Sequence, residues 1–395
     1  MPVNLIDIQN KLSAFSAQAK AHEAQIAIRH QEVTDLMATY AHRLEALQAR
    51  VARAAELVPR LRCAVPVDEP LNLALPCPDL PETFTVLAAD GSQINPSRHA
   101  RVKFCVINVA VVNMVRGSGE APRILTRSQL LDYDAIFLPS GGTISEGVVA
   151  LKRDLREREA LTELAGDLVQ PAISLTDGPL ELYREPQDAA GFAQALDRYL
   201  GVLDELRQRH LITAGYVDKP GGDLIARLLE LVALGDDDLS AYQQRGRRFA
   251  GVSDAALLSS LLSNPGDRSA VFAIQSEMAR HFSGELALHF FYLNVGRPGQ
   301  PHLARVEIPA WVAKDKALLG VLQGVLVEQA TMLGTRPYPY ILHRAHEEAL
   351  VTLQESEHVE ELIVAALLQR QVPVDEKSNK QYHKDLSTQK TRYQG

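Results

Sequence analysis

TFTVLAADGSQI, residues 83–94, is a run of β-branched and apolar residues that reaches an aspartate, Asp90, followed by Gly91. Such a run predicts a strand, and an Asp-Gly pair after a strand is typical of a turn. The alternative interpretation is that Asp90 is a carboxylate held at a strand end for chemistry. A second copy of the pattern, PAISLTDGPL (171–180), reaches Asp177 and again continues with glycine. The two copies therefore have to be interpreted together.

The residues between the two copies predict two more strands and a helix. Residues 102–115 form a valine-rich run, and ILTRSQLL (124–131) follows a hairpin-like turn. From Ser145, a plausible N-cap, the pattern SEGVVALKRDLREREALTELAGDLV is helical. The predicted order is a strand that leads to Asp90, two further strands, a helix, and a strand that leads to Asp177. This order predicts an α/β domain in which a sheet is flanked by helices.

The rest of the chain suggests four segments. Residues 1–64 are expected to be helical, either a long helix or hairpin packed on the body or a dimerisation or partner-docking element. Residues 65–82 contain five prolines and predict an extended linker. The main domain is expected at 83–373, with an antiparallel strand pair near 285–312 and helices at 314–333 and 343–369. Residues 374–395 are polar and predict a disordered tail.

A helical carboxylate would complete an acidic trio with Asp90 and Asp177. Such a trio suits Mg²⁺ or Mn²⁺, which prefer oxygen ligands and activate water in phosphodiester cleavage. Helical spacing places Glu159 on the apolar stripe of residues 148, 151 and 155, which should face the sheet. Glu159 is therefore favoured, and Glu157 and Glu163 remain as alternatives.

Composition limits the possible functions. The 395 residues carry a net charge of −8 and 46% hydrophobic residues, as in an ordinary soluble globular protein. Three cysteines in no metal-binding spacing favour a reduced, cytoplasmic protein. We find no signal peptide, no apolar run long enough to span a bilayer, and no GxxxxGK[ST] motif for ATP hydrolysis.

Three stretches taken in order, VLAADGSQ, ISLTDGPL and PYPYILHRAHEEAL, resemble the NurA family of prokaryotic nucleases. The resemblance implies an RNase H-like mixed β-sheet core flanked by helices, with an N-terminal helical extension here. It also implies a homodimer that degrades DNA with Mn²⁺ or Mg²⁺ beside HerA, a hexameric translocase ATPase. That activity would be single-strand endonucleolytic, 5′–3′ exonucleolytic or both, in end resection during double-strand break repair.

By position, the resemblance makes Asp90, Glu159 and Asp177 metal ligands and His346 a fourth ligand or an acid or base. A lone helical histidine is more often a surface or capping residue. His343, however, shares a face with His346, and a histidine ligand favours Mn²⁺ over Mg²⁺.

Other residues are candidates for contact with DNA, each with a structural alternative. Lys219, Arg336 and Arg153 could touch phosphates or be solvated surface charges. Tyr292 and Tyr338 could stack on bases or be packed aromatics.

The leading hypothesis is thus a metal-dependent deoxyribonuclease. The alternative is a dimeric adaptor that regulates a DNA translocase and has a weak or silent nuclease site.

Overall fold

A computed structural model of the chain describes residues 3–138, 141–166, 168–182, 189–235, 238–239, 242 and 247–375. The chain divides into two compact units, and each is described by itself. The first comprises residues 1–81, 178–181 and 212–340, and the second comprises residues 82–177, 182–211 and 341–395. Most of the predicted tail, from residue 376 on, lies outside the described residues.

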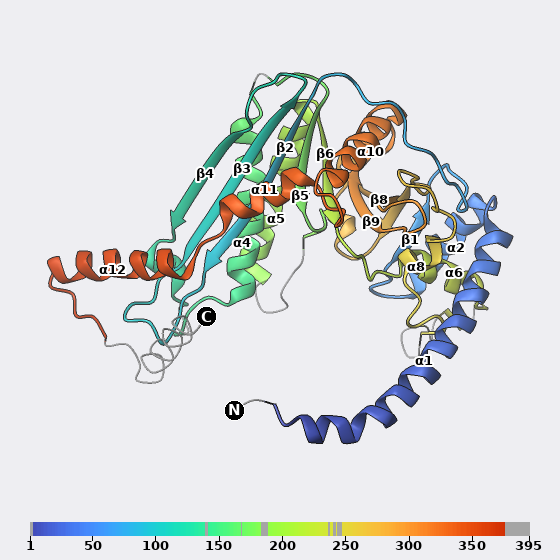
Figure 1. Ribbon diagram of the computed structural model, residues 1–395, viewed down its shortest axis with the longest axis horizontal. Helices are drawn as coiled ribbons and strands as arrows, with labels where there is room; N and C mark the ends of the chain where they lie inside the picture. Colours follow the sequence, from blue (N-terminus) through green and yellow to red (C-terminus); the bar gives the residue numbers. More distant parts are fainter. Residues whose placement is uncertain are drawn as a thin grey trace. The chain divides into compact units, whose positions relative to one another are not determined.

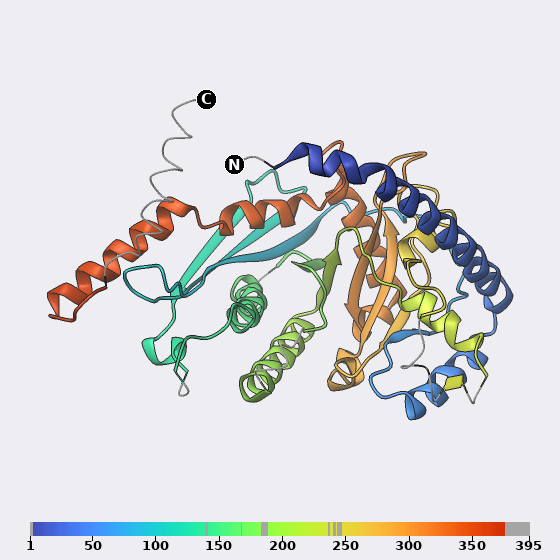
Figure 2. The ribbon, with the colours of Figure 1, turned by 90° about the horizontal axis from the view of Figure 1, so that it is seen from below.

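The second unit is a four-stranded mixed sheet covered by helices on both faces. Its strand order is β5-β2-β3-β4, antiparallel between β2, β3 and β4 and parallel between β2 and β5. Figure 2 shows α4 and α5 on one side of these strands and α11 on the other. The elements are β2 (Phe84–Ile94), β3 (Val106–Arg116), β4 (Arg123–Leu130), α3 (Tyr133–Ile136), α4 (Glu146–Leu164), β5 (Ala172–Asp177), α5 (Ala189–Gln208), α11 (Tyr340–Ala349) and α12 (Leu353–Gln369).

The sequence accounts for most of these elements. β2 and β3 are buried for their first six and seven residues, as expected for strands covered on both faces. The Ser145 side chain accepts a hydrogen bond from the Val148 amide and caps α4, as predicted. The predicted α/β class, with a mixed sheet, flanking helices and an N-terminal helical extension, is confirmed.

Two of the predicted boundaries are wrong. β2 does not end at Asp90 but continues to Ile94, paired with β3 throughout, so Asp90 and Gly91 are strand residues. The predicted helix over 343–369 is two helices, α11 and α12. Thr352 starts α12 with a capping box to Glu355, which gives the new helix its own satisfied N-terminus.

The first unit holds an antiparallel set of strands with the long N-terminal helices. Its strand order is β1-β7-β8-β9-β6. Its core includes Phe272 stacked on Phe290 at 5.5 Å between ring centroids. Figure 1 labels α1 beside α6 and α8, which it contacts. The elements are α1 (Leu5–Tyr40), α2 (Leu44–Leu57), β1 (Cys63–Pro66), β6 (Leu211–Val217), α6 (Leu224–Val232), α8 (Asp254–Leu258), β7 (Phe272–Gln275), η2 (Ala279–His281), η3 (Gly284–Leu286), β8 (Leu288–Asn294), β9 (Leu303–Pro309), α9 (Ala310–Ala313) and α10 (Lys316–Thr331).

The predicted antiparallel pair is confirmed as β8 and β9, and the segment 1–64, predicted to be helical, contains α1 and α2. Among the described helices, none combines the length and the apolar character that a bilayer crossing requires.

Candidate active site

Asp90 lies in the middle of the second unit, and its carboxylate meets His346. The two groups come from β2 and α11 and are joined by a 2.7 Å hydrogen bond between Asp90 Oδ2 and His346 Nδ1. The other Asp90 oxygen accepts the Gly91 amide at 2.8 Å. The Asp90 side chain is 16% exposed and the His346 side chain is 60% exposed, so the carboxylate is largely buried and the imidazole faces solvent. Residues 256 positions apart in sequence are thus brought together as predicted.

Two polar side chains of the sheet hold the end of α11 that carries His346. The Ser92 hydroxyl and the Asn108 amide both donate to the Ala349 carbonyl, at 2.5 and 2.8 Å. Ser128 in turn donates to Asn108 at 2.6 Å. The last carbonyls of a helix have no partner within the helix, so these contacts satisfy one of them. They also fix the position of His346 over β2.

The opposite face of β2 receives α4, and Gly91 is the point of closest approach. A Cβ on Gly91 would lie 2.8 Å from both Arg153 Cγ and Glu157 Oε1. Real Cβ contacts are essentially never that short, so glycine is required by the packing of α4. The sequence predicted Gly91 for a sharp turn, and that reason is wrong because Gly91 lies in an extended strand.

Glu157 is the carboxylate of α4 that is buried beside β2. Its side chain is 5% exposed and pairs with Arg153 at 3.2 Å and Arg158 at 3.9 Å. Burial raises the pKa of Glu157, the two arginines oppose the rise and the charges of Asp154 and Asp90 add to it, and the resulting pKa is about 8. A buried carboxylate with neighbouring negative charges is the environment in which functional acids are often found.

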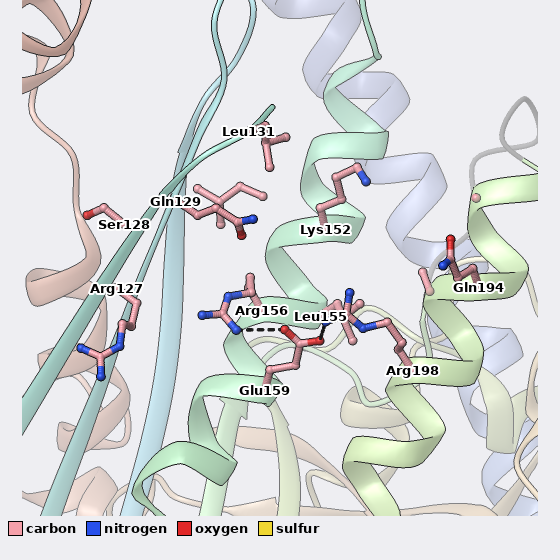
Figure 3. Close-up of a pocket in the computed structure, with 13 residues that line it drawn as sticks. Arg127, Ser128, Gln129, Leu131, Lys152, Leu155, Arg156, Glu159, Gln194 and Arg198 are labelled. Carbon is pink, nitrogen blue, oxygen red and sulfur yellow. Dashed lines mark hydrogen bonds and ion pairs between the residues drawn. The ribbon is translucent and has the colours of Figure 1, made fainter. Parts of the chain in front are cut away.

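Glu159 lies elsewhere on α4. It pairs with Arg156 at 3.0 Å and with Arg198 of α5, and it lines a groove between α4, α5 and β4 (Figure 3). The predicted stripe of 148, 151, 155 and 159 is not the buried face of the helix. The buried residues are Val149, Leu155, Glu157, Arg158, Ala160 and Leu161. The sequence argument missed this rotation because it did not allow a glutamate and an arginine to be buried together. A metal role for Glu159 stays a prediction.

Asp177 is placed next to Asp90 by the sheet register. The parallel pairing of β2 and β5 runs as far as Ala89 opposite Thr176. One step further along the same register lie Asp90 and Asp177, on strands about 4.8 Å apart. Asp177 is the exposed last residue of β5. Within the described ranges, no three histidine, cysteine, aspartate or glutamate side chains are gathered closely enough to form a metal site.

The other residues predicted to contact DNA do not lie together at one site. Tyr292 is fully buried and donates to Asp254 at 3.1 Å, so its ring cannot stack on a base, and that prediction is wrong. Tyr338 packs edge-on against Tyr216. Lys219 and Arg336 are exposed in the first unit, where their contact with DNA stays untested.

On α11, His343 points to Glu347 at 3.5 Å rather than to Asp90. Sequence reasoning missed the roles of Ser92, Asn108 and Arg153. Only the role of Arg153 had a signal in the sequence, because its i, i+4 spacing from Glu157 is typical of an ion pair on a helix.

Comparison with known proteins assigns the family. The NurA-domain model matches residues 84–351. A search of curated proteins gives no match. Similar solved structures include the catalytic domain of human endonuclease V, at 14% identity and a TM-score of 0.30, covering 80% of this chain and 94% of that chain. Another is LC9-RNase H1, a type 1 RNase H with the type 2 active-site motif, at 12% identity and a TM-score of 0.21, covering 45% and 81%. At these TM-scores the two structures carry no weight in the assignment. The domain match spans more than half of the 395 residues and includes Asp90, Glu157, Asp177 and His346, and the chain therefore belongs to the NurA family of nucleases.

Proposed function

We propose that this chain is a divalent-metal-dependent deoxyribonuclease that cleaves phosphodiester bonds at Asp90 and His346. The observation that carries the proposal is the 2.7 Å pairing of Asp90 with His346, beside the buried Glu157 and within the NurA-domain match. An exposed histidine held by a sheltered carboxylate is suited to moving a proton at a scissile phosphate.

The donor atoms are of the kind that a hard divalent cation prefers, and its binding would draw together side chains that form no ready cluster among the described residues. Asp90, Glu157 and Asp177 offer carboxylate oxygens, and His346 adds a nitrogen that favours Mn²⁺ over Mg²⁺. A cation there would supply an activated water and neutralise charge on the phosphate.

The chain's own residues have separate tasks in this scheme. Asp90 pairs with His346 on one side of β2, and Glu157 lies buried against α4 on the other. Arg153, paired with Asp154 at 3.2 Å and with Glu157 at 3.2 Å, holds the Glu157 carboxyl in place against β2. Ser92 and Asn108 position His346 through α11. No nucleophilic side chain is required.

The test uses the purified full chain and a labelled single-stranded oligonucleotide. We expect cleavage with Mn²⁺, none with EDTA, and none in Asp90→Asn, which removes the charge and keeps the shape. His346→Ala should retain less than about one hundredth of the rate if it moves a proton. Full activity of Asp90→Asn with Mn²⁺ supplied would refute the mechanism.

The biological setting follows from the family resemblance and remains part of the proposal. We infer a homodimer that resects DNA ends beside a HerA-like hexameric ATPase, with single-strand endonuclease or 5′–3′ exonuclease activity. A size-exclusion measurement of mass, and cleavage assays on 5′- and 3′-labelled strands with and without such an ATPase, would test each part.

A second function is supported by the start of α1. Six apolar side chains there are 45–69% exposed: Val3, Leu5, Ile6, Ile8, Leu12 and Phe15. Such a surface fits a docking element of an adaptor that regulates a translocase. A chain that binds such an ATPase yet cleaves no DNA with Mn²⁺, alone or in complex, would favour the adaptor over the nuclease.

A further inference from the structure

The second unit contains a basic groove away from Asp90 and His346. It has a volume of about 440 Å³ and is bounded by the sheet, α4 and α5. Figure 3 shows Arg127 and Gln129 on β4, Lys152 and Arg156 on α4, and Gln194 and Arg198 on α5. Three elements therefore contribute side chains to one open groove.

The groove is positively charged on a chain that is negative overall. Among the described residues, four cations line it, Arg127, Lys152, Arg156 and Arg198, and one acid does, Glu159. The whole chain carries −8. A local excess of positive charge in a groove concentrates anionic ligands there even when the net charge of the protein repels them.

Glu159 holds two of these cations in place without neutralising the groove. It pairs with Arg156 and Arg198, one from each helix, while Arg127 and Arg156 also reach Glu163 at 3.2 and 3.3 Å. Lys152 is exposed, and it forms no ion pair with another described residue. Guanidinium groups held in this way keep free N–H donors that match phosphate oxygens.

The groove lies on the side of the sheet that α4 and α5 cover, whereas His346 lies on the side that α11 covers (Figure 2). Lys152, Arg156 and Glu159 lie on one face of α4, whereas Glu157 lies about 100° further round the helix axis than Arg156.

We propose that this groove binds the phosphate backbone of single-stranded DNA outside the cleavage site. This inference rests on the proposed nuclease function. The groove combines arginines for phosphates with Gln129 and Gln194, whose amides can meet phosphates or base edges. Holding the strand there keeps it on the enzyme between successive cleavage events.

Fluorescence anisotropy tests the proposal with a labelled oligothymidylate in EDTA, so that no cleavage is needed. The test variant is Lys152→Ala/Arg198→Ala. The matched control is Lys314→Ala/Arg60→Ala, which removes one lysine and one arginine that are 61% and 82% exposed in the first unit. Both variants should melt like the wild-type chain, because all four side chains lie at the surface.

We expect about 10-fold weaker binding in the test variant and a salt slope lower by about 1.4, since each phosphate contact on a single strand contributes about 0.7. The control should bind as the wild type does. Glu159→Gln removes the acid that lines the groove in the described part of the chain and should tighten binding several-fold.

Equal binding by the test variant and the wild type would overturn the proposal, as would an equal loss in the control. The proposal would also be overturned if the test variant lost binding to a labelled poly-glutamate peptide but kept binding to DNA, because the groove would then take an acidic protein segment. A wild-type chain that binds DNA through the groove yet never cleaves it with Mn²⁺ would refute the nuclease function and leave this site standing.

Discussion

The replacement Glu157→Gln separates stability from activity at the proposed site. Glu157 is buried, and its pKa is raised from 4.5 to about 8, whereas in the unfolded chain it ionises near 4.5. Between pH 4.5 and about 8, the Glu157 carboxyl is therefore protonated in the folded protein and ionised in the unfolded chain. Because the folded state binds more protons than the unfolded state, Glu157 lowers the free energy of unfolding as the pH rises from 4.5 to 8.

The size of the effect follows from the same two values. At pH 7 the solution is about 2.5 pH units above the ordinary pKa of glutamate, and each unit corresponds to about 1.4 kcal/mol. Glu157 thus destabilises the metal-free protein by up to about 3 kcal/mol at pH 7 relative to a permanently neutral side chain of the same shape. The amide of the variant replaces a carboxyl that also bonds Arg153 and Arg158, and this exchange offsets part of the gain, so we expect a net gain of about 1–3 kcal/mol.

The assay is chemical denaturation in EDTA at a series of pH values, beside cleavage in Mn²⁺. Glu157→Gln should unfold at a higher denaturant concentration than the wild type at pH 7.5, and the difference should nearly vanish at pH 5. Its cleavage rate should fall at least about 100-fold. Mn²⁺ should raise the midpoint of the wild type but not that of the variant, because the cation binds a ligand that only the wild type has.

Glu159→Gln is the matched control, because the same chemical change is made two residues away on the same helix. It should keep cleavage. The reasoning would be refuted if Glu157→Gln cleaved DNA normally or were less stable than the wild type in EDTA at pH 7.5. If Glu159→Gln lost cleavage and Glu157→Gln did not, Glu159 would be the metal ligand of α4, as the sequence predicts.

Two further predictions address packing and acid stability. Gly91→Ala should lower both stability, by about 1–3 kcal/mol, and cleavage, because its Cβ would meet two α4 side chains at 2.8 Å. Gly201→Ala, in open space on α5, should leave both measurements unchanged or slightly improved. Burial alone would raise the pKa of Glu69, but hydrogen bonds from Arg268 and Lys316 outweigh it and lower the pKa to about 2. The stabilisation by Glu69 is therefore present above pH 4.5 and lost as pH falls toward 2. Glu69→Gln should destabilise the chain by up to about 3 kcal/mol at pH 7 and little at pH 2, as measured by denaturation midpoints; an equal loss at both pH values would contradict the ion-pair explanation.

The sequence alone determined the order and type of the elements near the site. Alternating apolar residues identified β2, β3 and β5, a serine cap located the start of α4, and two Asp-Gly pairs marked Asp90 and Asp177. These features are local, since hydrophobic periodicity and capping act over a few residues. The association of His346 with Asp90 came from the family resemblance, because no local signal relates residues 256 positions apart.

Only the tertiary structure decided which carboxylate of α4 lies beside Asp90. Helical periodicity limited the choice to a few positions, but the rotation of α4 depends on what packs beneath it. Gly91 leaves room for α4 to come close, and the arginines at 153 and 158 make a buried glutamate tolerable at 157. Charged residues are usually expected at the protein surface, and this expectation cannot identify a glutamate such as Glu157 that is buried together with its arginine partners.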